Sequence, residues 1–163
     1  MACQIAFTAV LIAFSCSADL DADPWIGKEV FRKDGAKAKI GSKEIDFKLI
    51  PFPATVEDVD GEWLWLSRAW VRKSDVFLTE QALDFYTEQV RKHPSSADDR
   101  RRLGSVWSTR GDLENAINEF DEAIRLDPKL AAAYVGRGIS RLHKNDLDNA
   151  IDDFAEAIRL DPK

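Results

Sequence analysis

The chain has 163 residues, of which 45 % are hydrophobic and 32 % are charged, a balance that is typical of globular rather than disordered proteins. The formal net charge of −6 argues against nucleic acid as the main partner, because phosphate binding requires clustered Lys and Arg. The one basic run, 100–102, follows two aspartates, and we interpret it as a solvated helix face rather than an anion site. This length allows one medium-sized domain or two small ones, and the change of character along the chain favours two.

The first segment, 2–18, contains no charged side chain, and its apolar run 5–14 is followed by small residues. This pattern predicts a secretory leader over 1–18 that is cleaved near Ala18, followed by a linker over 19–24. The apolar run is shorter than the roughly 20 residues that a bilayer requires, so we do not predict a stable transmembrane span.

Both cysteines, Cys3 and Cys16, lie inside this leader. A processed protein would therefore contain no disulfide and no cysteine nucleophile. Processing would place the protein in the periplasm, the cell envelope or the medium, whereas an unprocessed chain would be cytoplasmic. Lipid attachment at Cys16 is the less favoured alternative, because the leucine that is usual three residues before such a cysteine is missing.

Residues 25–78 have a different composition, in which glycines separate short runs rich in Val, Ile, Phe and Trp. Such runs predict the short strands of a small β-barrel. The pair Asp60-Gly61 predicts a hairpin between 56–59 and Trp63–Leu66. The run GEWLWLSRAWVRKSDV, residues 61–76, resembles the central and closing strands of Src-homology-3-like barrels, especially bacterial ones of exported proteins.

Strand alternation places Trp63 and Trp65 on one face of this segment and Leu64 and Leu66 on the other. If the leucines face the core, the two tryptophans lie outward beside Trp70 and form a ligand face for proline, peptide or sugar. The alternative is that the tryptophans cover the end of the barrel or pack on the helices.

The segments 111–129 and 145–163 repeat each other 34 residues apart, with 14 of 19 positions identical. A period of this length is typical of stacked helical pairs. In each copy the apolar residues fall at the three-and-four spacing of one helical face. Asp112 and Asp146 are predicted to cap the helix starts, and Pro128 and Pro162 follow an aspartate that they exclude from helical geometry. A second helix is predicted upstream in each copy, over 97–109 and 130–144.

This arrangement resembles the tetratricopeptide repeat (TPR). Its pattern of small and large residues is matched at Leu103, Gly104, Trp107, Ala116, Phe120, Ala123 and Pro128, and again at Tyr134, Gly138, Ala150, Phe154, Ala157 and Pro162. The sequence departs from the pattern at Arg100 and Arg141, where a large apolar residue and an aromatic residue are usual.

The resemblance implies a partial TPR helix over 79–94 and two repeats over 95–128 and 129–163. The predicted fold class is therefore α+β with two modules, a small N-terminal β-barrel followed by an all-α stack of about two and a half repeats.

In TPR proteins one stripe on the first helix of each repeat lines a concave groove. The corresponding residues here are Asp98, Arg101, Ser105 and Ser108, followed by Ala132, Val135, Ile139 and Leu142. This groove would be polar at one end and apolar at the other, which suits a partner helix or an extended peptide. The alternative is that Val135, Ile139 and Leu142 pack against neighbouring helices as ordinary core. The Lys and Asn pattern that clamps a C-terminal carboxylate in some TPR domains is absent.

The sequence contains no pattern that indicates catalysis, a metal site or a cofactor. His93 and His143 lie near predicted helix ends, and we interpret both as capping or surface residues rather than catalytic bases. We therefore predict a non-enzymatic protein-interaction adaptor that presents a TPR groove to a protein or peptide.

The alternative is a module that binds cell-wall material or peptide through the barrel tryptophans, with the helices as an oligomerisation element. A third interpretation makes the chain the accessory part of a larger hydrolase. An uncapped last repeat also predicts homo-oligomer formation, because it exposes apolar surface.

Overall fold

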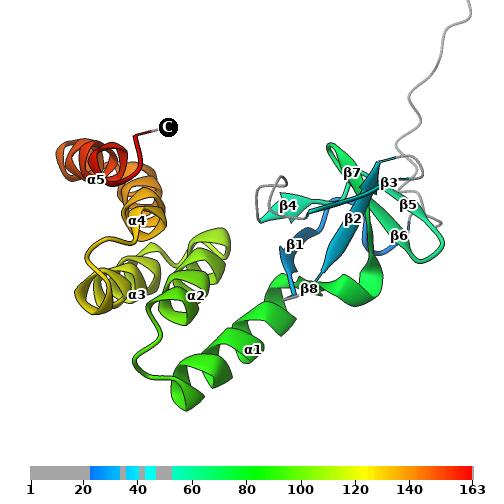
Figure 1. The fold of residues 1–163 in the computed structure, drawn as a ribbon, viewed down its shortest axis with the longest axis horizontal. Coiled ribbons are helices and arrows are strands. Elements are labelled where there is room, and N and C mark those ends of the chain that lie inside the picture. The colour runs from blue at the N-terminus through cyan, green and yellow to red at the C-terminus, as the bar shows by residue number, and fades with distance from the viewer. Residues whose placement is uncertain (1–22, 34–35, 41–42, 47–52, 163) are drawn as a thin grey trace, which may run out of the picture.

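The structure is a computed structural model that describes residues 23–33, 36–40, 43–46 and 53–162. The predicted leader and most of the predicted linker lie outside these residues. Strands occupy the first part of the described chain and five helices the second, so the prediction of an α+β fold with two modules is confirmed (Figure 1). No described helix is long and apolar enough to cross a membrane.

The described residues contain eight strands in two antiparallel sheets, which together we call the β-module. One sheet has the order β4-β1-β8 and the other the order β3-β2-β7-β6-β5. The strands are β1 (Glu29–Arg32), β2 (Lys37–Ile40), β3 (Lys43–Asp46), β4 (Ala54–Thr55), β5 (Asp58–Asp60), β6 (Trp63–Leu66), β7 (Ala69–Arg72) and β8 (Val76–Leu78), with a 3-10 turn, η2 (Lys73–Asp75), before the last.

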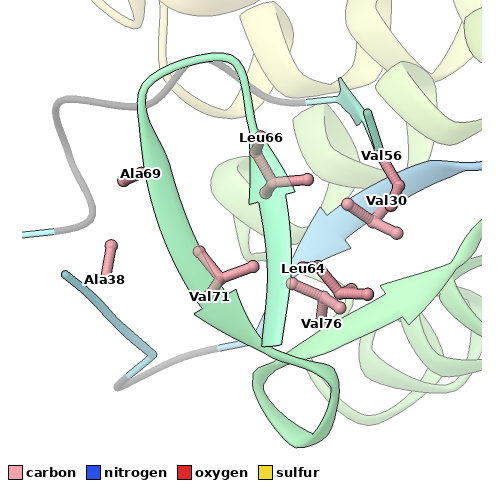
Figure 2. Packing of buried hydrophobic residues seen from close by; sticks show 8 residues of the cluster. All are labelled: Val30, Ala38, Val56, Leu64, Leu66, Ala69, Val71 and Val76. Carbon is pink, nitrogen blue, oxygen red and sulfur yellow. The ribbon is translucent and has the colours of Figure 1, made fainter. Parts of the chain in front are cut away.

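The hairpin predicted at Asp60-Gly61 joins β5 to β6, and Val59 pairs with Leu64. Gly61 has φ +57°, a conformation that costs glycine little. Leu64 and Leu66 are fully buried and point into the core between the sheets, together with aliphatic residues of five other strands and segments (Figure 2). The core residues are Val30, Ala38, Val56, Leu64, Leu66, Ala69, Val71 and Val76.

The helices are α1 (Thr79–Lys92), α2 (Ala97–Thr109), α3 (Leu113–Leu126), α4 (Ala131–His143) and α5 (Leu147–Leu160). The Asp112 side chain accepts a hydrogen bond from the Asn115 amide at 3.2 Å and caps α3 as predicted. Asp146 precedes α5 at the predicted place, but the prediction of a backbone cap there is wrong. Both oxygens of its carboxylate instead accept from Nδ2 of Asn149, each at 2.9 Å, and no backbone amide of α5 donates to this side chain.

Close helix packing in the stack depends on glycines beneath Phe120, which is almost fully buried. A Cβ at Gly104 on α2 would lie 3.0 Å from the Phe120 ring, and a Cβ at Gly136 on α4 would lie 2.4 Å from it. The same relation recurs one repeat later between Gly138 and Phe154. A Cβ at Gly136 would clash with the ring of Phe120, and a Cβ at Gly104 would require the ring to shift slightly, so both glycines favour the close approach of α2 and α4 to α3.

The two arginines that depart from the TPR pattern have acidic partners. Arg100 of α2 donates from Nη1 to Glu119 of α3 at 2.9 Å. Thirty-four residues after Glu119 lies Asp153 of α5, which is 3 % exposed and accepts from Arg137 at 2.5 Å and from Arg141 at 2.7 Å. The charge of each unusual arginine is thus neutralised between neighbouring helices.

The β-module meets the helices through a cluster in which Phe31 of β1 packs with Ala82 and Tyr86 of α1 and with two residues of α2. Phe77 of β8 packs against the same cluster and contacts Phe85, with ring centroids 4.7 Å apart. The Tyr86 hydroxyl donates to the carbonyl oxygen of Arg32 at 3.1 Å. Helix α1 follows β8 directly and leads from the sheets into the helical stack (Figure 1).

Candidate functional site

A cavity of about 400 Å³ lies where α2 and α4 face the β-module. Six of the eight residues on the predicted groove stripe line this cavity: Arg101, Ser105, Ser108, Ala132, Val135 and Ile139. The other two, Asp98 and Leu142, do not line it, and Leu142 is 47 % exposed.

Helical spacing explains why these residues meet. Arg101, Ser105 and Ser108 recur at intervals of four and three on α2, so their side chains share one face. Ala132, Val135 and Ile139 do the same on α4. Because Gly136 lets α4 approach Phe120, both faces open onto the same space, and Phe120 and Gly136 also line the cavity. Val135 and Ile139 are each 40 % exposed, so a large part of both side chains is available for contact with another molecule.

The polar end of the cavity has its charges paired. Arg101 donates to Asp98 from Nη2 at 2.7 Å and from Nε at 3.0 Å, and Arg102 contacts the same carboxylate at 2.7 Å. Partial burial opposes ionisation of Asp98, but the guanidiniums of Arg101 and Arg102 outweigh it and lower the pKa of the carboxyl group. Arg101 is therefore a neutralised part of the groove wall rather than an unpaired cation.

The two serines on α2 are also engaged. Ser105 Oγ donates to the carbonyl oxygen of Arg101 at 3.1 Å. Ser108 Oγ accepts from Ser140 of α4 at 3.2 Å, and this bond joins the two walls of the groove. The groove thus offers a small polar surface beside an apolar one, with little net charge.

Some lining residues were not predicted. His143 lies four residues after Ile139, so the periodicity of the stripe indicates it, although it was interpreted as a capping or surface residue. Glu29 of β1 and Pro53, which directly precedes β4, line the cavity from the β-module. No helical periodicity connects them to the stripe, and their position depends on how the modules pack.

The tryptophans of the predicted ligand face lie on the outer side of β6 and β7 and are partly exposed. Trp65 and Trp70 are opposite each other in the register, with ring centroids 5.4 Å apart. The Trp63 ring is covered by the ammonium of Lys39 at 3.8 Å and lies 5.2 Å from the Arg72 guanidinium. In the described part of the chain, the cluster between sheets and helices consists of phenylalanines, a tyrosine, aliphatic residues and Trp107, and it includes none of these three tryptophans.

Within the described ranges, no group of three or more His, Cys, Asp or Glu side chains is placed to hold a metal ion. His93 Nδ1 lies 3.4 Å from Asp99 at the end of α1, with its imidazole largely exposed.

The tetratricopeptide repeat family profile matches residues 78–131 and 101–163, which together make up more than half of the chain. The chain belongs to the tetratricopeptide repeat family. No curated protein is significantly similar to it.

Solved TPR structures share the fold of the helical stack. The Arabidopsis OM64 TPR domain is 25 % identical with a TM-score of 0.51, covering 52 % of this chain and 69 % of that one. The first TPR of Spaghetti (RPAP3), bound to the HSP90 peptide SRMEEVD, is 22 % identical with a TM-score of 0.51 and covers 52 % and 68 %. The TPR2B domain of yeast Sti1, in its pHsp70 complex, is 20 % identical with a TM-score of 0.50 and covers 51 % and 66 %.

Proposed function

We propose that this TPR protein is a non-enzymatic adaptor that binds a peptide or a helix of another protein in the cavity between α2 and α4. The observation that carries this proposal is that six residues expected to line a groove surround one cavity. Support also comes from the solved TPR domain that holds an HSP90 peptide, because the helical stacks share a fold.

The chemistry of the walls indicates the kind of ligand. Val135 and Ile139 suit apolar side chains, and a ligand that covers them gains about 25 cal/mol for each Å² of apolar surface removed from water. Arg101 is paired with Asp98, so it does not present a free cation to a ligand carboxylate. We therefore propose a ligand with two or three apolar anchors rather than an acidic C-terminal tail.

The test selects peptides from a random library on the wild-type chain and measures their affinity by calorimetry. The double variant with Val135→Asp and Ile139→Asp should no longer bind the selected peptides, and its far-ultraviolet circular dichroism should be unchanged. Ile26→Asp is a matched control, because Ile26 is 44 % exposed and lies outside the helices. Unchanged affinity of the double variant for these peptides would show that the groove is not the binding site.

A second candidate function is binding of cell-wall glycan or peptide by Trp63, Trp65 and Trp70, with the helices as an oligomerisation element. It is favoured by the burial of Leu64 and Leu66, because the alternating tryptophans then lie on the outer face. This candidate includes the interpretation of residues 25–78 as a Src-homology-3-like barrel. Its test is co-sedimentation with purified peptidoglycan, compared between wild type, Trp63→Ala and Trp65→Ala. Equal retention of all three would eliminate it.

We also propose that the protein is exported after cleavage near Ala18, in line with the uncharged segment 2–18. N-terminal sequencing of the protein purified from its natural cells tests this. A mature N-terminus close to residue 19 is expected, and an N-terminus at residue 1 or 2 would contradict export by cleavage.

A further inference from the structure

Helix α5 forms the end of the helical stack that is farther from the β-module along the chain (Figure 1). It packs on α4 and presents an apolar stripe to solvent. Leu147 is 50 % exposed, Ile151 is 63 % exposed and Ile158 is 67 % exposed, and Ala155 between them is also exposed. These four residues, which we call the α5 stripe, are spaced four, four and three apart and share one helical face.

The preceding repeat shows how the same face is normally covered. The residues 34 positions earlier, Leu113, Ile117 and Ile124 of α3, are only partly exposed. Ile124 packs against a cluster that includes Ala133 of α4, the next helix in the stack. An apolar face with this geometry is therefore a helix-packing surface.

One substitution distinguishes the two faces. Asp121 of α3 accepts a hydrogen bond from Arg137 of α4 at 2.5 Å, which joins the third helix to the fourth. The residue 34 positions after Asp121 is Ala155, so α5 lacks the carboxylate for such a contact. The α5 stripe is instead continuous and has a small residue inside it, which allows a partner helix to approach closely. Its partner is thus not expected to repeat the contact between α3 and α4.

The other end of the stack is partly occupied by the β-module. The β-module packs on α1 through Phe31 and Phe77, and it therefore occupies surface that the last helix of another chain would need for head-to-tail stacking. The simplest surface of a second copy to pack against the α5 stripe is the α5 stripe of that copy. Two identical surfaces in contact form a closed, two-fold symmetric dimer.

Charge favours antiparallel helices in this contact. Helix α5 has Asp148 in its first turn and Arg159 in its last. These residues are eleven positions apart, about three turns, and lie on the same flank of the stripe. In an antiparallel pair each Asp148 approaches the partner's last turn. Arg159 already contacts Glu156 at 2.6 Å, and its remaining donors can serve a second carboxylate.

We propose that the α5 stripe is a homodimer interface in which two copies pack α5 against α5 in antiparallel orientation. Leu147 of one copy then lies near Ile158 of the other, and Ile151 of one copy lies near Ala155 of the other, with the two-fold axis between them. Because a single helix pair buries less than about 1,200 Å², at the low end for specific interfaces, we expect the dimer to be weak.

Sedimentation equilibrium of the full chain over about 1 to 100 μM tests the proposal. The wild type should approach twice the mass of one chain, and Ile151→Arg should remain monomeric with unchanged circular dichroism. Ile139→Arg, a matched exposed isoleucine on the groove face of α4, should still dimerise. A monomeric wild type, a dimeric Ile151→Arg or a monomeric Ile139→Arg would each overturn the proposed interface.

Disulfide cross-linking tests the orientation, in chains whose Cys3 and Cys16 are replaced by serine. A mixture of a Leu147→Cys chain and an Ile158→Cys chain should cross-link readily on mild oxidation. Cross-linking of Leu147→Cys chains with one another, in preference to the mixture, would overturn the antiparallel arrangement.

Discussion

Replacing Asp153 by asparagine should destabilise the helical stack more than any change of a surface charge. Asp153 is 3 % exposed and is the shared partner of Arg137 and Arg141. Asp153→Asn keeps the shape of the side chain but leaves two guanidiniums without their carboxylate. Removing one partner of a fully buried ion pair costs about 3 to 5 kcal/mol.

The expected loss is smaller than that range for two reasons. The arginine side chains are 16 % and 20 % exposed, so water can hydrate them in part, and Arg137 keeps its contact with Asp121. We therefore expect a loss of about 2 to 3 kcal/mol in the free energy of unfolding. The assay is urea unfolding followed by far-ultraviolet circular dichroism, which reports on the helices.

The neighbouring Asp152 provides a matched control, because it is exposed and its replacement leaves the arginine partners in place. Asp152→Asn should change the free energy of unfolding by no more than about 0.5 kcal/mol. If Asp153→Asn behaves like Asp152→Asn, the buried carboxylate does not hold α4 and α5 together, and the reasoning is refuted.

Three further predictions concern packing and pH. Gly136→Ala should lower the free energy of unfolding by about 1 kcal/mol, because overpacking against Phe120 exceeds the helix propensity gained. Gly104→Ala should cost less in the same urea assay, since its Cβ would be farther from the ring, and the reverse order would contradict the packing argument. Leu64→Ala should cost about 3 kcal/mol, measured by tryptophan fluorescence in urea, whereas Ile40→Ala on the exposed surface should cost little. Hydrogen bonds from Arg91 lower the pKa of Glu88 from 4.5 to about 2, so the ionised pair stabilises the fold above pH 4.5 and this contribution is lost as the pH falls towards 2. An NMR titration of Glu88 in Arg91→Ala should show a higher pKa, and an unchanged value would disprove the role of Arg91.

The repeat period was the strongest signal in the sequence. The 34-residue period and the Pro128 and Pro162 stops predicted the helix pairs, and alternation in Trp63–Leu66 predicted that one pair of side chains faces the core. These predictions depend on local periodicity, which a sequence displays directly.

Contacts between distant segments were not predictable in this way. The position of Asp153 in the sequence does not show that Arg137 and Arg141 converge on it from another helix. The Asp146 cap was assigned by its position, but the choice between Asn149 and a backbone amide depends on side-chain geometry. Glu29 and Pro53 reach the cavity only through the packing of the β-module on α1.

The participation of Glu29 and Pro53 in the cavity has a thermodynamic consequence. A molecule seated between α2 and α4 would touch the strand region and the repeats at once. Its binding free energy would then add to the free energy that fixes the strands against α1, by linkage. Occupancy of the cavity and rigidity of the junction at Phe31 would therefore rise together. A bound ligand would reduce the motion of the β-module relative to the helical stack.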